Sequence, residues 1–317
     1  MNTFVNLLKR EYLEHYGAFL WSPVVVLALI VIFGLMFAGG SGSLDFEMAD
    51  GENSSSIQIE AEGDDDALGR ALTALVFDVA GTTDAELSER MAGLMNLIPI
   101  PFYWVWVIVS LFGLIACLHD ERKDRSVLFW KSMPVGDMQT VASKYAFLAW
   151  VAPMLTLSVI LVAQLFVTFL LVGLVEDGMG MRLLMHSGIV MSFLQIFVGF
   201  IVNGFVVLPV FAWFILVSGW AKSMPMVWAF AVPFWLIVLE SIVIDSDRIA
   251  SFVAYHLSMP SLPGTSSDGE EPFINVSVTS FAEQLTVLGQ AQFWLGLVIG
   301  LCFLAGAVYL RRVRNEI

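Results

Sequence analysis

One short stretch between two apolar segments is rich in charged side chains. The run Asp120–Asp124 holds five consecutive charged residues, and Arg125 follows it. On a helix, Glu121 and Arg125 are four residues apart in the orientation that favours an ion pair. Such residues indicate binding by charge and apolar contact rather than catalysis. The residues of this stretch that offer a charge or an apolar surface for contact are Glu121, Arg122, Lys123, Arg125, Val127, Trp130, Lys131 and Pro134. The alternative is a membrane-surface helix whose Lys and Arg side chains contact anionic lipid.

A second group of polar residues stands inside the apolar segments. Polar side chains at membrane depth mark substrate or ion pathways, or else form hydrogen bonds between helices. Glu240 lies four residues from the outer end of its segment. It can therefore also be interpreted as a carboxylate that reaches the external interface. The candidate translocation path consists of Gln164, Gln195, Asn203 and Glu240.

Motifs of the common catalytic and metal sites do not occur in this sequence. It contains no G-x-x-x-x-G-K-[ST], no H-E-x-x-H and no G-x-S-x-G. The four histidines are scattered, and the two cysteines, Cys117 and Cys302, stand far apart in apolar segments. The sequence therefore predicts a protein that is not itself an enzyme and has no cofactor or metal site of its own.

The elements that must position these residues are transmembrane helices. Of the 317 residues, 58% are hydrophobic and 14% are charged, and the mean hydropathy is +0.81. One crossing of a bilayer takes about 20 apolar residues. The predicted fold class is an all-α polytopic membrane protein, one permease domain over 1–317, with six transmembrane helices. These are Ala18–Ala38, Leu97–Leu118, Ala146–Val175, Leu183–Gly219, Met224–Ile244 and Ala291–Leu310.

Three local features qualify these six segments. Leu183–Gly219 is predicted to be one long or broken helix, with the break near Asn203-Gly204 and Pro209. Pro153 and Pro233 are expected to kink the third and fifth helices. Gly296 and Gly300 form G-x-x-x-G, which predicts a face of close helix packing.

The distribution of charge predicts the orientation in the membrane. Six spans place 11 of the 15 Lys and Arg residues on one side, and 21 of the 29 Asp and Glu residues on the other. By the positive-inside rule, both termini and the connector 119–144 are cytoplasmic. The acidic balance argues against nucleic acid as a partner.

The segments outside the spans differ in character. Residues 1–17 are predicted to form an interfacial amphipathic helix, with Val5, Leu8, Tyr12 and Tyr16 as its apolar stripe. Two large acidic extracytoplasmic loops are expected over 39–96 and 245–290. They contain helical patterns in "DAELSERMAGLMNL" and "DRIASFVAYHLSM". They are solvated loops or, alternatively, a small external cap.

The stretch "DERKDRSVLFWKSMPVGDMQTVASKY" resembles the cytoplasmic connector of type-2 ATP-binding-cassette (ABC) permeases. In that family a Glu-Arg pair, a short apolar helix, a small-residue–x–Pro-Val turn and a Gly/Ser-Lys pair precede the third span. The corresponding residues are Glu121-Arg122, Val127–Trp130, Ser132–Val135 and Ser143-Lys144. The family commonly has Gly-Thr after the charged pair, whereas Arg125-Ser126 stands here.

The resemblance implies the permease subunit of an ABC exporter in a bacterial cytoplasmic (inner) membrane. Such a subunit works with a second permease copy or paralogue, and a separate soluble ATPase subunit carries ATP and Mg²⁺. The connector would be the coupling helix that docks in the ATPase. Because the spans are so apolar, we expect a hydrophobic or amphipathic substrate. Two alternatives stay open: a secondary transporter or channel without an ATPase, and a membrane sensor or scaffold that transports nothing.

Overall fold

The computed structural model describes residues 3–38, 83–126, 135–175, 179–258 and 281–313. Over these residues all regular secondary structure is helical, as predicted, and six helical segments are long and apolar enough to cross a membrane. This is compatible with the predicted all-α multi-pass membrane protein. The candidate spans are Phe4–Met36, Asp84–Lys123, Asp137–Leu174, Gly180–Val206, Pro225–Ile244 and Ala291–Val313.

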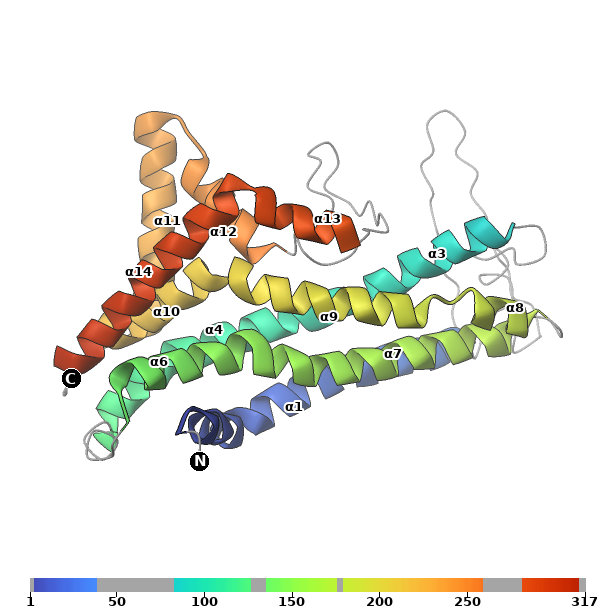
Figure 1. Cartoon of the computed structure of the whole chain (residues 1–317), viewed down its shortest axis with the longest axis horizontal. Helices are drawn as coiled ribbons and strands as arrows, with labels where there is room; N and C mark the ends of the chain where they lie inside the picture. The colour runs from blue at the N-terminus through green and yellow to red at the C-terminus, as the bar shows by residue number, and fades with distance from the viewer. Residues whose placement is uncertain (1–2, 39–82, 127–134, 176–178, 259–280, 314–317) are drawn as a thin grey trace.

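Four long helices form the body of the bundle. α1 (Thr3–Ala38), α4 (Pro99–Lys123) and α7 (Ala152–Leu174) contact one another, and α9 (Ile189–Val206) packs against α7 (Figure 1). An aromatic cluster lies between α4, α9 and α10 (Leu208–Trp220). In it, the ring of Trp106 lies 5.9 Å from the ring of Phe200 and 5.7 Å from the ring of Phe211. Between lipid-embedded helices such packing, rather than hydrophobic transfer, provides the stabilisation.

The N-terminal segment is not a separate element. α1 is one continuous helix from Thr3, and its first turns, seen nearly end-on in Figure 1, run at an angle to the remainder. Val5 and Tyr16 are exposed, in keeping with an apolar stripe directed at lipid, whereas Glu11 on the other face is buried in the bundle. The predicted boundary at residue 17 is therefore absent.

The third span is irregular directly before Pro153, the residue at which the sequence predicts a kink. α6 (Asp137–Ala146) continues through a π-helical turn, η1 (Phe147–Val151), into α7. Pro153 is the second residue of α7, and a proline inside a helix removes a backbone donor and crowds the preceding turn. The wider turn accommodates it just before the proline. Trp150, which lies in η1, donates through Nε1 to the carbonyl of Ile201 on α9 at 3.2 Å.

The fourth apolar segment is broken twice. α8 (Gly180–Met185) ends before Gly188, whose φ of 62° is a left-handed conformation that glycine adopts without strain. α9 then ends at Val206, and α10 (Leu208–Trp220) carries Pro209 in its first turn. The broken alternative of the prediction is thus confirmed, and the break at Val207 lies between the two predicted markers, Asn203-Gly204 and Pro209.

The last helix packs closely on α10. α14 (Ala291–Val313) presents Gly300 to α10, where an added Cβ would lie 2.6 Å from Leu208 Cγ. One turn earlier, an added Cβ at Gly296 would lie 2.0 Å from His256 Nε2. The G-x-x-x-G motif is therefore a close-packing face, as predicted, with α10 and α12 as its two partners.

Two further helices begin at recognisable signals. α3 (Asp84–Leu97) starts with a capping box, in which the Thr83 hydroxyl accepts from Glu86 N and the Glu86 carboxylate accepts from Thr83 N. α12 (Arg248–Leu257) follows the fifth span directly. Both helical patterns predicted within the acidic segments are confirmed; "ALGRALTALVFDVA", the other such pattern in 39–96, lies outside the described residues.

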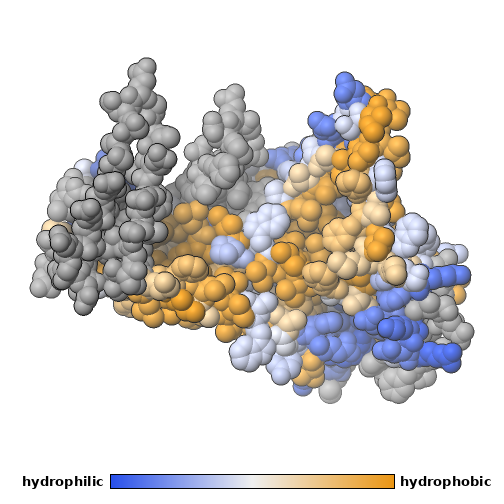
Figure 2. Space-filling model, turned by 180° about the vertical axis from the view of Figure 1, so that it is seen from behind, coloured by the Kyte–Doolittle hydropathy of each residue, from blue (hydrophilic) through white to orange (hydrophobic). Residues whose placement is uncertain are grey.

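The fifth span stands apart from the main bundle. α11 (Pro225–Ile244) contacts α4, α10 and α12 and leaves most of its surface exposed (Figure 1). Two short helical elements, α13 (Phe281–Thr286) and η2 (Val287–Gly289), precede α14. In Figure 2 hydrophilic residues gather at the end of the molecule where the chain begins and ends, and hydrophobic residues cover the neighbouring surface.

Candidate functional site

A carboxylate at the end of α4 is the centre of a buried ion-pair network. Glu121 Oε1 lies 3.1 Å from Arg10 Nη2 and 3.1 Å from Lys144 Nζ. Its other oxygen pairs with Arg311 Nη1. The three basic residues come from α1, α6 and α14, so one side chain connects the ends of four helices.

Lys144 and Glu11 form the most deeply buried pair of this network. Lys144 Nζ lies 3.2 and 3.3 Å from the two oxygens of Glu11, and both side chains are 2% exposed. Arg10 Nη2 donates to Glu11 Oε1 at 2.8 Å as well as to Glu121. Each carboxylate therefore receives at least two basic groups.

The network also holds the other end of the connector. Arg311 Nε lies 3.3 Å from Asp137 Oδ1, and Asp137 is the first residue of α6. Glu121 and Asp137 stand on the two sides of the segment 122–136, and both bind Arg311. The connector is thus fixed at both ends to the same cluster of charges.

The charges at the centre of the network are equal in number, and one further carboxylate, the exposed Glu14, pairs with Arg10 at 3.2 Å at its edge. Three carboxylates, Glu11, Glu121 and Asp137, face three basic side chains, Arg10, Lys144 and Arg311. Taking ions out of water is expensive, and only close pairing with additional hydrogen bonds compensates for it. Removing one partner would leave a buried charge uncompensated, so we expect the six residues to act as a unit.

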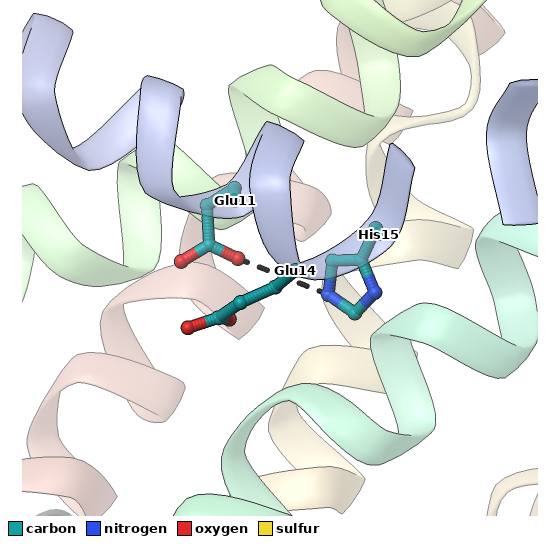
Figure 3. A group of neighbouring side chains, drawn as sticks. All are labelled: Glu11, Glu14 and His15. Carbon is teal, nitrogen blue, oxygen red and sulfur yellow. Dashed lines mark ion pairs between the residues drawn. The ribbon is translucent and has the colours of Figure 1, made fainter. Parts of the chain in front are cut away.

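Figure 3 shows the edge of this network on α1, where Glu11, Glu14 and His15 lie close together. Their possible metal-ligating atoms are within 4.8 Å of one another. Glu11, however, already binds Lys144 and Arg10, and His15 Nε2 lies 4.0 Å from Glu11 Oε2. Ion pairing within the network accounts for this arrangement.

The predicted partner-contact residues divide into two groups. Glu121 and Arg122 point into the bundle; Arg122 Nη2 donates to the carbonyls of Ser218 at 2.7 Å and Ala221 at 2.8 Å. Lys123 and Arg125 are exposed. The remaining predicted contacts, Val127, Trp130, Lys131 and Pro134, lie outside the described residues.

The expected helical pair between Glu121 and Arg125 does not form. α4 ends at Lys123, and Arg125 has a φ of 57°, in the left-handed region. The physical reason is that Glu121 already pairs with three basic residues from other helices. Ion pairs with largely buried partners are stronger than a pair with an exposed arginine such as Arg125.

Gln164 joins a polar cluster between α3, α7 and α9. Its Nε2 donates to the carbonyl of Met95 at 3.1 Å and to Ser192 Oγ at 2.9 Å. Ser192 Oγ donates in turn to Asn96 Oδ1 at 3.2 Å. Sequence reasoning identified Gln164 but not its partners, which come from segments 69 and 28 residues away.

The other candidate path residues do not join this cluster. Gln195 and Asn203 are buried on α9. Glu240 lies on α11 and is 7% exposed. Its two oxygens accept from the backbone amides of Arg248 at 3.1 Å and Ile249 at 2.7 Å, which makes Glu240 the cap of α12.

A cavity of about 580 Å³ lies under α12, enclosed by α4, α10, α11 and α14. Its walls are apolar and aromatic, and Arg248 is the single charged residue among those that line it. Residues that line it from the four neighbouring helices and α12 include Leu111, Trp213, Phe230, Phe252 and Phe303. A cavity with such walls suits an apolar or amphipathic molecule.

Comparison with protein families, with curated proteins and with solved structures finds no match to this chain.

Proposed function

We propose that this chain is the membrane-spanning permease subunit of an ABC exporter. In this proposal it resides in a bacterial inner membrane with both termini cytoplasmic and works with a second permease copy or paralogue. A separate soluble ATPase supplies the energy. The resemblance of the connector 119–144 motivates the proposal, and the observation that carries it is the attachment of both ends of that connector to one buried network.

This attachment supplies what a mechanical link requires. A force applied to the connector reaches Glu121 and Asp137, and through their ion pairs it reaches α1, α6 and α14. Because these bonds join the ends of rigid helices, a displacement of the connector would move the helices together as a rigid body. A flexible polar turn would absorb the same displacement.

The cavity under α12 supports the proposed class of substrate. It is lined by α4 and α14, two helices tied to the network through Glu121 and Arg311, so movement of the connector would change its shape. Its apolar walls fit a hydrophobic or amphipathic molecule rather than a hydrated ion. Arg248 at its lining offers one positive charge to an anionic end of such a molecule.

The proposal is tested by co-expressing this chain with its genomic neighbours and purifying it in detergent. The measurements are whether a soluble P-loop protein is retained and whether the purified material hydrolyses ATP. Lys123→Glu with Arg125→Glu reverses two exposed charges on the connector and should abolish association with the ATPase. Lys9→Glu, an exposed charge reversal on α1, is the matched control and should leave association intact.

A second variant separates docking from transmission. Glu121→Gln removes the charge at the centre of the network while leaving the exposed connector charges in place. We expect the ATPase to remain associated and its hydrolysis to lose coupling to the permease. A chain that purifies without an ATPase, with no hydrolysis in any variant, would contradict the proposal and favour a secondary transporter.

A further inference from the structure

A basic pocket of about 430 Å³ lies at the network end of the bundle, between the end of α4 and the turn from α10 to α11. Seven residues line it, and none carries a carboxylate: His119, Arg122, Lys123, Arg125, Lys222, Ser223 and Met224. Four cationic side chains facing one space repel one another. An anion in that space would relieve the repulsion, so the pocket has the charge of an anion-binding site.

A separate apolar groove lies on the outer face of α11, and its first lining residue comes three residues after the basic pocket ends in the sequence. A cavity of about 410 Å³ is lined by Val227, Trp228, Ala231, Val232, Trp235, Leu236 and Leu239, all on α11. The groove begins at Val227, one helical turn beyond Met224 in the basic pocket. At about 1.5 Å per residue, the distance from Val227 to Leu239 is about 18 Å.

The aromatic residues beside the pocket mark the edge of the bilayer. Trp220 and Trp228 are both exposed, and their rings meet at 5.6 Å. Tryptophan favours the level of the lipid headgroups. The basic pocket would then lie at the level of the lipid headgroups, and the apolar groove on α11 at the level of the acyl chains.

We propose that the pocket and groove together bind one anionic phospholipid, with its phosphate among the basic side chains and an acyl chain along α11. Basic pockets between transmembrane helices bind acidic headgroups, and the groove supplies the apolar surface that a free anion would not need. The charge of the pocket and the closeness of the groove, which begins three residues after Met224, favour this occupant over a second copy of the chain. The inference does not depend on the proposed transport function.

The test measures lipid binding to the detergent-purified chain by native mass spectrometry. The probes are phosphatidylglycerol, phosphatidylcholine of the same acyl length, and inorganic phosphate. Phosphatidylglycerol should bind at least tenfold more tightly than phosphatidylcholine, and millimolar phosphate should not displace it. At about 1 kcal/mol for each basic residue, Lys222→Gln should weaken its binding about fivefold, and the double variant Lys222→Gln with Arg125→Gln about 30-fold.

Two further variants keep the interpretation specific. Lys9→Gln removes an exposed lysine from α1 and should change binding less than twofold. Ala231→Phe should obstruct the groove and weaken binding of the long-chain lipid while leaving a dihexanoyl form unaffected. Arg122 is kept intact, because its hydrogen bonds to Ser218 and Ala221 hold α4 against α10.

Three results would overturn the proposal. Equal binding of the two lipids would mean that the basic pocket does not select a headgroup charge. Displacement of the lipid by inorganic phosphate would assign the pocket to a free anion. A cross-link between Ala231→Cys residues of two chains, together with no retained lipid, would assign the groove to a second copy.

Discussion

Replacing Lys144 with methionine should destabilise the network end of the bundle. Lys144 Nζ lies 3.2 and 3.3 Å from the oxygens of Glu11 and 3.1 Å from Glu121, and its side chain is 2% exposed. Methionine fills a similar space without the charge, so the variant isolates the electrostatic contribution. Breaking a buried ion pair by removing one partner costs about 3–5 kcal/mol.

The expected loss lies at the lower end of that range. After the substitution Arg10 still binds both carboxylates, at 2.8 Å on Glu11 and 3.1 Å on Glu121, and Arg311 still binds Glu121. We therefore expect the free energy of unfolding to fall by about 3 kcal/mol, which is about a hundredfold in the unfolding equilibrium. Adding Glu11→Gln should remove one uncompensated carboxylate. The double variant should then lose about 1–3 kcal/mol less than the sum of the single variants.

The chain supplies its own reporter for this measurement. Cys117 is buried in α4, and Cys302 is exposed on α14. In a Cys302→Ser background, labelling by a thiol-reactive dye during denaturant titration in detergent follows the exposure of Cys117. Lys123→Met is the matched control, because Lys123 is exposed at the end of α4, two residues after Glu121. This variant should change the free energy of unfolding by less than about 0.5 kcal/mol.

Two results would refute this reasoning. If Lys144→Met unfolds within about 1 kcal/mol of the unmodified chain, the pairs of Lys144 contribute little beyond the other bases. If the effects of Lys144→Met and Glu11→Gln are additive, the two residues are not energetically coupled, and the network is not a unit.

Three further predictions concern helix packing at α12 and α14. Gly300→Ala should destabilise the chain by about 1–3 kcal/mol in the same titration, because its Cβ would meet α10, whereas Gly173→Ala, which meets nothing within 4 Å, should not. Glu240→Gln should cost about 1 kcal/mol locally, seen as faster hydrogen exchange of the first two amides of α12. Burial lowers the pKa of His256, so the unfolded chain binds its proton more readily; stability should fall as pH drops below about 6.5, and His256→Gln should reduce that slope in thermal unfolding.

The candidate residues show where local pattern stops being informative. The sequence marks Glu121 and Arg122 as charged residues at a helix end, a position that is usually solvated, yet both point into the bundle. The sequence left two interpretations of Glu240, a carboxylate that reaches the external interface and a member of an ion path; it did not reveal that Glu240 accepts from the first amides of α12. The partner of a buried polar group is set by helix packing, which local composition does not encode.

The amino-acid sequence by itself determined the class of this protein, the approximate spans and the positions of its helical patterns. A span depends on about 20 consecutive apolar residues, and helix signals such as Thr83 and Pro209 act over a few neighbours. The tertiary structure alone decided that Glu121 meets Arg10, Lys144 and Arg311, because those residues lie as many as 190 positions away. Their meeting depends on which helices are adjacent and on how each is rotated, and both follow from side-chain packing across the whole bundle.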